Sequence, residues 1–191
     1  MKVYDDVLGK ASLTLLQSEI VTESFPWNFH VTTERKNNYS PFDYSFAHIV
    51  QRDNEITSSY FGVIFPIVLG MFERVGIEFE KIFRLRLALQ TPMGREYINE
   101  PHIDDTIPHK AAIFYLNDSD GSTLLYANRY DPKSELSARE YKLKIGFENF
   151  RIAKEVEPKA NRLLVFDGYN YHSSQRPLKY HSRIILNINF N

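Results

Sequence analysis

The sequence predicts a mainly β protein with N-terminal helices, an α+β chain whose core is an antiparallel sandwich or jelly roll. Apolar residues recur at helical spacing in roughly the first 80 residues, and from Lys81 onward they alternate with a period of two. Short apolar runs then follow one another with turn residues between them, and no helical segment separates each pair. We expect a single domain over residues 1–191, with a helical and irregular support layer over 1–80 and a jelly-roll core over 81–191.

Two helices are expected in the support layer. The segment Asp5–Ile20 carries an apolar stripe at helical spacing, and Thr57–Val75 reads as a second helix that Gly76 is placed to end. The longest apolar run, Tyr60–Phe72, contains Pro66 and is too short to cross a bilayer. We therefore interpret this run as part of a buried helix.

The segment Phe25–Asn54, between the two helices, is rich in aromatic residues and has no regular period, so irregular structure is expected there. Its aromatic side chains are interpreted as fastening a loop to the core, with substrate stacking as the alternative. These side chains are Trp27, Phe29, Tyr39, Phe42, Tyr44 and Phe46.

Six strands are expected in the core. Along Ile82–Gln90, large apolar side chains alternate with Arg84, Arg86, Ala88 and Gln90, as in a strand with one apolar face. The other five strands are Lys110–Asn117, Ser122–Ala127, Phe150–Val156, Arg162–Asp167 and Ser182–Phe190. Turn residues separate them, at residues 92–94, 118–121, 131–132 and 167–168.

Composition excludes several classes of function. Lys plus Arg number 23 and Asp plus Glu number 24, so the net charge of −1 disfavours a protein that binds nucleic acid mainly through phosphates. The chain has no cysteine, which excludes disulfides, thiol catalysis, Fe–S clusters and Cys-type zinc sites. The first ten residues lack the apolar core of an export signal. We expect a cytoplasmic protein that does not bind membranes and that holds any metal through His and carboxylate side chains.

The segment PHID places His102 and Asp104 two residues apart. In an extended chain these side chains point to the same face and can reach one metal ion, although a surface turn is the simpler interpretation of the pair alone. His172 follows a late strand, and a jelly roll brings distant strands side by side. Two imidazoles and one carboxylate on one face of an octahedral ion form the facial triad of non-haem Fe(II) oxygenases.

Arg183 is the third element of the predicted site. It lies on the less apolar face of Ser182–Phe190, together with Ile185, Asn187 and Asn189. A guanidinium inside a barrel is costly unless it binds an anion, such as the far carboxylate of a metal-chelating dicarboxylate. Taken alone, Arg183 can also be a surface ion-pair partner. The alternatives in the sequence are Asp105, His109 and His181 as ligands, and Arg176 and Lys179 as anion partners.

With these residues in place, the sequence resembles the 2-oxoglutarate and Fe(II)-dependent dioxygenases, in particular the small prolyl-4-hydroxylase-like branch, which includes phage-encoded members. The resemblance covers residues 82–191. It is carried by four motifs: PHID, the run AIFYLND with the DG that follows it, FDGYNYH and HSRIILNINF. It implies a double-stranded β-helix core, and a location in the host cytoplasm if the protein is phage-encoded.

The resemblance also implies roles for individual residues. His102, Asp104 and His172 would ligate Fe(II), and Arg183 would pair with the distal carboxylate of 2-oxoglutarate. Two further residues would contribute to the co-substrate site: Tyr115, by a hydrogen bond to that carboxylate, and Thr123, near the pocket. Tyr115 can also be an ordinary core residue.

The implied reaction uses O2 and 2-oxoglutarate to hydroxylate a substrate C–H bond, with release of succinate and CO2. A peptidyl proline or another residue is the first substrate class by analogy, followed by a nucleobase or a small metabolite. A procollagen-type substrate is not implied, because those enzymes have Lys where this chain has Arg183. The loop Thr91–Glu100 is a candidate lid, and Tyr126–Glu148 is either an entrance segment or a solvated loop with a short helix.

Two other classes of function compete with this interpretation. A cupin-type isomerase or hydrolase would hold Zn²⁺ or Mn²⁺ with the same ligands and would have no use for Arg183. A non-catalytic binding protein or virion jelly roll would need none of the three metal ligands.

Overall fold

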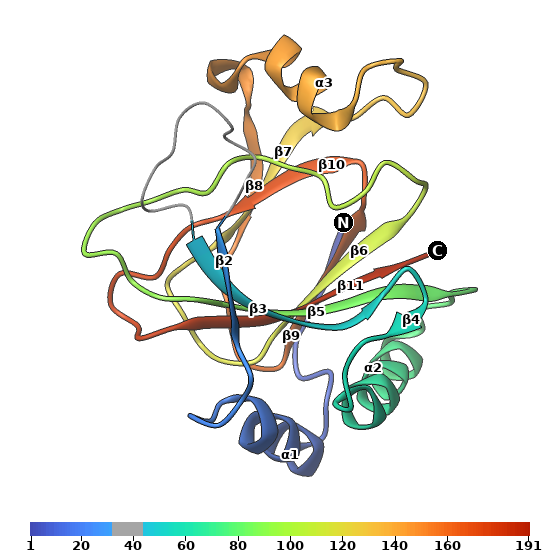
Figure 1. Cartoon of the computed structure of the whole chain (residues 1–191), viewed down its shortest axis with the longest axis vertical. Coiled ribbons are helices and arrows are strands. Elements are labelled where there is room, and N and C mark those ends of the chain that lie inside the picture. Colours follow the sequence, from blue (N-terminus) through green and yellow to red (C-terminus); the bar gives the residue numbers. More distant parts are fainter. Residues whose placement is uncertain (32–43) are drawn as a thin grey trace.

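The computed structural model describes residues 1–31 and 44–191, and two antiparallel sheets facing each other form its centre (Figure 1). The major sheet has the strand order β1-β9-β6-β11-β5-β3-β2, with β4 paired to β3. Its strands are β1 (Lys2–Tyr4), β2 (Asn28–Val31), β3 (Tyr44–Arg52), β4 (Glu55–Ile56), β5 (Ile82–Gln90), β6 (Lys110–Tyr115), β9 (Arg162–Asp167) and β11 (Arg183–Phe190).

The minor sheet contains β10 (Asn170–Ser174), β7 (Thr123–Arg129) and β8 (Ile152–Val156), in that order. In both sheets, strands distant in the sequence are neighbours: β11, the last strand, lies between β6 and β5. This arrangement confirms the predicted jelly roll.

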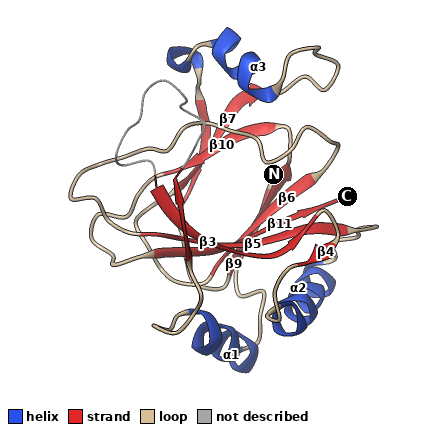
Figure 2. Ribbon diagram, in the orientation of Figure 1, coloured by secondary structure: helices blue, strands red, loops and turns tan. Residues whose placement is uncertain are grey.

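Helices cover the outer faces of the two sheets (Figure 2). The helices α1 (Lys10–Ile20) and α2 (Phe61–Val75) lie against the major sheet, whereas α3 (Ala138–Ile145) and the 3-10 turn η1 (Phe147–Asn149) lie beyond the minor sheet. The helix α2 ends where Gly76 adopts a left-handed conformation with φ of 65°. No helix in the described parts of the chain is long and apolar enough to cross a membrane.

The hydrophobic core lies between the major sheet and its two helices. The strand β11 is buried along its whole length, and one of its faces packs Leu186, Ile188 and Phe190 among helix residues such as Phe72 and Leu16. The other face of β11 looks toward the minor sheet. The alternation of side chains thus assigns one face of this strand to stability and leaves the other face for a site.

The predicted elements are largely present, with one clear error. All six expected strands form, and both expected helices form with later starts, at Lys10 and Phe61. Irregular structure over Phe25–Asn54 is wrong, because β2 and β3 both pair within the major sheet. A bulge between Ile49 and Gln51 shifts the register of β3 and breaks the period of two that would have revealed it.

The aromatic side chains of this segment contact one another. The ring centroids of Phe25 and Trp27 lie 4.7 Å apart, and that of Tyr60, just before α2, lies 4.8 Å from Phe25. All three side chains belong to or pack against the main core cluster, so this part of the chain is fastened to the core as expected. Phe29 packs against both Tyr44 and Phe46 at 5.8 Å. Two of the aromatic residues named from the sequence, Tyr39 and Phe42, lie outside the described residues.

Leu186 tests how strongly the fold depends on the core face of β11. Its side chain is fully buried, so Leu186→Ala should lower the free energy of unfolding by about 2–5 kcal/mol. Leu178 is 44% exposed, and Leu178→Ala should change stability by less than about 0.5 kcal/mol. Urea denaturation followed by circular dichroism measures both. Equal effects of the two substitutions would contradict this assignment of the core.

Candidate metal centre

A short backbone pairing places the two candidate histidine ligands side by side. His102 and His172 form an isolated antiparallel bridge, in which each backbone N–H donates to the carbonyl of the other residue at 2.9 Å. A second bridge, between Ile98 and Gln175, holds the preceding loop along the end of β10. The two imidazole rings consequently lie with their centroids 4.5 Å apart.

Each imidazole is oriented by its own backbone contact. The Nδ1 atom of His102 lies 3.1 Å from the carbonyl of Glu100, and that of His172 lies 3.4 Å from the carbonyl of Asn170. A carbonyl only accepts, so these contacts place the proton on Nδ1 and leave each Nε2 lone pair free. The Nε2 atom of His172 faces Oδ1 of Asp104 at 4.0 Å.

The carboxylate of Asp104 is anchored from the major sheet. Its Oδ2 accepts hydrogen bonds from the side-chain amides of Asn187 at 3.0 Å and Asn189 at 2.9 Å, both on β11. On β5, Nη1 of Arg84 lies 3.3 Å from Oδ1. Two strands therefore fix the position of this carboxylate, and Oδ1 is directed toward the histidines.

The environment favours the protonation states that a metal needs. Burial alone would raise the pKa of Asp104, but His172, Arg84 and the hydrogen bond from Asn189 outweigh burial and hold it well below the usual range. Burial, with a further contribution from His102, lowers the pKa of His172 to about 4. At neutral pH the site therefore holds an ionised carboxylate and an uncharged His172, both of which can donate electron pairs.

The donor set fits a divalent transition-metal ion. One candidate ligand atom from each of His102, Asp104 and His172 lies within 4.8 Å of the other two. Two imidazoles with one carboxylate suit Fe(II), Mn(II) or Zn(II), and three protein ligands leave positions for other molecules. The structure thus brings together the three residues that the sequence singled out, whereas their role as ligands stays a prediction.

Arg183 lies on the face of β11 that carries Asn187 and Asn189, at the first residue of the strand, and it is almost fully buried. Its guanidinium donates to the carbonyl of Gly121 at 2.7 Å, to Oγ1 of Thr123 at 2.6 Å and, more weakly, to Oε1 of Gln90 at 3.4 Å. Within the described chain no carboxylate pairs with it. A buried cation whose partners are all neutral would be stabilised by a nearby anion.

Tyr115 and Thr123 support this guanidinium in different ways. Tyr115 is fully buried, and its hydroxyl donates to Oγ1 of Thr123 at 2.7 Å. Burial raises the pKa of Tyr115, so it remains a neutral donor. Because Oγ1 of Thr123 already accepts from Tyr115 and Arg183, its own proton is free to point into the cavity. Thr123 lines the cavity, whereas Tyr115 lies behind Thr123, so the direct contact of Tyr115 with a co-substrate stays a prediction.

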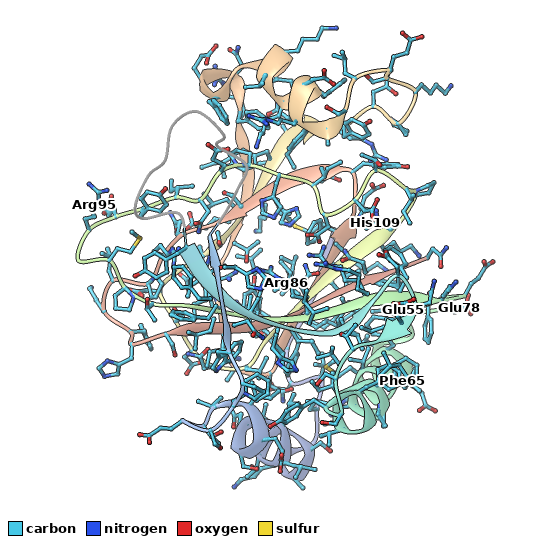
Figure 3. All side chains as sticks on the ribbon, in the orientation of Figure 1. Glu55, Phe65, Glu78, Arg86, Arg95 and His109 are labelled. Atoms are coloured by element: carbon cyan, nitrogen blue, oxygen red, sulfur yellow. The ribbon has the colours of Figure 1, made fainter. Side chains whose placement is uncertain are left out.

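A single cavity joins the metal ligands to Arg183. Its volume is about 430 Å³, and it lies between the two sheets, where Figure 3 places Arg86. Its lining includes His102, Asp104 and His172 at one wall and Arg183 with Thr123 at another. The volume is within the range of pockets that bind small molecules.

The alternative ligands named from the sequence lie elsewhere. Asp105 caps the turn after it by accepting from the backbone N–H groups of Thr106 and Ile107. His109 is buried beside the metal site but does not line the cavity, and its ring packs against Gly168 so closely that no side chain would fit there. His181 is exposed. These three residues are therefore poorly placed as ligands.

The alternative anion partners are also outside the cavity. Arg176 is buried, donates to the backbone carbonyl of Tyr44 and stacks over the ring of Tyr44, with its guanidinium carbon 5.1 Å from the ring centroid. Lys179 is exposed. Of the three cationic residues considered, only Arg183 lines the cavity.

Sequence reasoning assigned no role to several residues that shape the site. Arg84 and Gln90 on β5, and Asn187 and Asn189 on β11, hold Asp104 or Arg183. The sequence did contain a signal for these residues. Both β5 and β11 have strongly apolar residues on one face and carry arginines and amides at alternate positions on the other. Such residues inside a buried strand need partners, and here the partners are the charged groups of the site.

The segment after β7 confirms the expectation of a loop with a short helix. The helix α3 begins at a capping box, in which Ser137 and Glu140 exchange hydrogen bonds with each other's backbone. Lys142 on α3 is buried and pairs with Glu100 at 3.1 Å, which connects this segment to the loop that leads to His102. The segment is therefore attached to the rim of the cavity.

The fold is shared with a known class of solved structures. The chain has the double-stranded β-helix fold of the 2-oxoglutarate and Fe(II)-dependent oxygenases, as many solved structures of that kind match it. No protein-family model and no curated sequence matches the chain, so the likeness is visible in the structure rather than in overall sequence identity.

Three solved structures illustrate this similarity. The α-ketoglutarate-dependent epimerase SnoN from nogalamycin biosynthesis aligns with a TM-score of 0.66 at 12% identity, over 98% of this chain and 76% of SnoN. A prolyl-4-hydroxylase of Pseudomonas putida aligns with a TM-score of 0.57 at 16% identity, over 100% of this chain and 91% of the hydroxylase. HygX from Streptomyces hygroscopicus, solved with nickel and 2-oxoglutarate, aligns with a TM-score of 0.59 at 13% identity, over 99% of this chain and 81% of HygX.

Asn189 should control metal affinity without being a ligand. Replacing Asn189 by Leu keeps the volume but removes one donor from Oδ2 of Asp104, so Mn(II) should bind roughly ten to a hundred times more weakly. Electron paramagnetic resonance of free Mn(II) measures this affinity. Asn149→Leu, at an exposed residue outside the cavity, is the matched control. Unchanged affinity in folded Asn189→Leu would show that Asp104 needs no such support.

His172 should make the stability of the metal-free protein depend on pH. Its pKa falls from the ordinary value of 6.5 to about 4 on folding, so between these pH values the unfolded chain binds more protons. The free energy of unfolding should therefore rise from about pH 4 to pH 6.5 and lose this contribution in His172→Gln. Urea denaturation with a chelator present, at several pH values, compares the two proteins. Identical pH slopes would contradict the buried, uncharged state of His172.

Proposed function

We propose that this protein is an Fe(II)- and 2-oxoglutarate-dependent dioxygenase that hydroxylates a C–H bond of its substrate, with release of succinate and CO2. The observation that carries this proposal is the pairing of two features in one cavity: a His-Asp-His donor set and a buried arginine without an acidic partner. A metal-chelating dicarboxylate would satisfy both features at once. The similarity to oxygenases solved with iron or 2-oxoglutarate supports the same reaction class.

His102, Asp104 and His172 would hold the metal ion. Bound iron and 2-oxoglutarate together supply the activation of O2 that permits oxygen insertion into a C–H bond. Arg183 would pair with the distal carboxylate of 2-oxoglutarate, and the free hydroxyl proton of Thr123 can donate to the same carboxylate. Tyr115 would keep Thr123 oriented, since it donates to the Oγ1 atom.

The residues around the metal would also protect the reaction from water. Ile113 and Ile185 line the cavity between the ligands and Arg183 and reduce the space that water can occupy. Asp104 carries two amide hydrogen bonds in addition to its contact with Arg84, so it would remain ionised and fixed while other ligands of the metal exchange. The protein thus supplies orientation and exclusion of solvent, and the cofactors supply the chemistry.

A peptidyl proline or another peptidyl residue is the first substrate class that we propose, and a small metabolite or a nucleobase is the second. The similarity to the prolyl-4-hydroxylase of Pseudomonas putida, and to a Trichoplax adhaerens prolyl hydroxylase solved with a peptide fragment, supports the first class. The similarity to SnoN and to the carbocyclase SnoK, both of nogalamycin biosynthesis, supports a small-molecule substrate equally well.

A cupin-type isomerase or hydrolase with the same metal ligands is the competing function. It differs from the proposed dioxygenase at Arg183, because it needs no buried cation to hold a co-substrate. The burial of Arg183 among neutral partners in the same cavity favours the dioxygenase.

An anaerobic titration tests the proposal. Adding Fe(II) and then 2-oxoglutarate to the metal-free protein should produce a weak visible charge-transfer band, which His172→Ala should abolish. Arg183→Ala should weaken 2-oxoglutarate binding by roughly a hundredfold, because a charge-assisted pair with a carboxylate is lost from a buried site. Calorimetry measures this second effect.

Leu178→Ala, at an exposed residue outside the cavity, serves as the control and should leave both the band and the affinity unchanged. If wild-type protein binds Fe(II) but neither forms the band nor binds 2-oxoglutarate, the dioxygenase proposal fails. Metal-dependent activity that survives Arg183→Ala would then favour the cupin-type function.

A further inference from the structure

A second group of cationic side chains lines the cavity, separate from Arg183. Arg84 and Arg86 lie on β5, where they pair in register with Asn189 and Asn187 of β11. Arg52, at the end of β3, lies opposite Arg84 in the sheet, and His30 on β2 lines the same part of the cavity. Figure 3 shows Arg86 directed into the space between the sheets.

The negative charges of the cavity do not balance these arginines. Asp104 is already held by Arg84, Asn187 and Asn189, and Glu100 pairs with Lys142. No hydrogen-bond acceptor within the described chain contacts Arg86 or Arg52. Bound metal and 2-oxoglutarate would not change this balance, since the two charges of the metal and those of the co-substrate cancel.

Arg86 is the more informative of the two unpaired arginines, because it is half-buried. Burial and the neighbouring Arg84 lower the pKa of Arg86 to about 10 against the opposing effect of the Asp104 charge, so Arg86 stays charged at neutral pH. Burial, Arg86 and Arg52 also lower the pKa of His30, which keeps that imidazole uncharged beside them. A charged guanidinium held in a partly desolvated cavity without a partner is stabilised by a bound oxyanion.

This group is separated from Arg183 along β5. Gln90, which contacts Arg183, lies four residues from Arg86 on β5, a separation of about 13 Å along the strand. Asp104 lies nearer to the second group, since Arg84 contacts it directly. The cavity therefore has one cationic region at Arg183 and a second one on β5 and β3, level with the strand positions that hold Asp104.

We propose that Arg86 and Arg52 bind a carboxylate or phosphate group of the substrate, so that the substrate of this protein is an anion held with its negative group beside the metal centre. This inference rests on the proposed dioxygenase function and narrows its substrate class. The guanidinium of Arg86 matches the two oxygens of such a group, and Arg52 lies beside the site at the exposed end of β3. Neutral substrates would leave Arg86 unpaired.

Paramagnetic relaxation tests this site without knowledge of the true substrate. The protein is loaded with Mn(II) and saturated with 2-oxoglutarate, which occupies the Arg183 end of the cavity. Inorganic phosphate, followed by ³¹P resonance, and ¹³C-acetate are then titrated separately. Protein is kept in excess over Mn(II) so that little free ion remains. Because relaxation by Mn(II) decreases steeply with distance, an anion bound in the cavity then responds and one on the outer surface does not. Saturable relaxation is expected with wild-type protein, and the anion with the tighter binding identifies the chemical group.

Variants of Arg86 locate the bound anion. Arg86→Met should weaken anion binding roughly tenfold to a hundredfold, since it removes a charge-assisted pair, whereas Arg86→Lys keeps the charge but loses the bidentate contact and should weaken binding less. Arg52→Met should have a smaller effect, because this side chain is exposed. Arg74→Met, at an exposed position of α2 outside the cavity, is the matched control and should bind like wild type.

The Mn(II) and 2-oxoglutarate affinities of each variant separate the possible failures. If wild-type protein binds neither Mn(II) nor 2-oxoglutarate, the dioxygenase function itself fails. If both bind but the anions give no saturable relaxation, or if Arg86→Met binds them like wild type, the substrate is not recognised through Arg86. A loss of 2-oxoglutarate affinity in Arg86→Met would assign Arg86 to the co-substrate and would also overturn the proposal.

Discussion

The hydrogen bonds that hold the Asp104 carboxylate are the interactions on which the rest of the site depends. Asp104 belongs to a loop with little regular structure, yet two amides of β11 and a guanidinium of β5 fix its position. The same contacts connect that loop to the two central strands of the major sheet. A buried carboxylate without them would be costly and would tend to take up a proton. With them, it is an anion directed at two imidazoles.

The strands that provide these contacts serve two purposes through simple alternation. On β11, Leu186 and Ile188 build the core, and Arg183 and Asn187 build the cavity. A shift of one residue in the pairing of this strand would exchange the two sets and place charge in the core. The helices α1 and α2 therefore contribute to the site indirectly, because the apolar face that they cover fixes which face is left for chemistry.

Strong alternation made much of this arrangement predictable. The strands Ile82–Gln90 and Ser182–Phe190 followed from it, and so did the separation of Arg183 from the apolar face. The strand β3 was not predicted, because a bulge interrupts its period and its aromatic residues resembled a loop. The contacts of Asp104 with Asn187 and Asn189 could not be derived from the sequence either, since they depend on how a loop crosses the sheet. The candidate ligand set could be named from the sequence, whereas the contacts that support it required the fold.

The antiparallel bridge between His102 and His172 has a consequence for how the protein is assembled. Backbone hydrogen bonds, rather than metal bonds, align the two imidazoles, and their Nδ1 protons are directed to nearby carbonyls. In the proposed dioxygenase, folding of the chain would thus orient both imidazoles before an ion binds. Metal loading would then be a separate event from folding, and one ion could be exchanged for another while the backbone pairing stays in place.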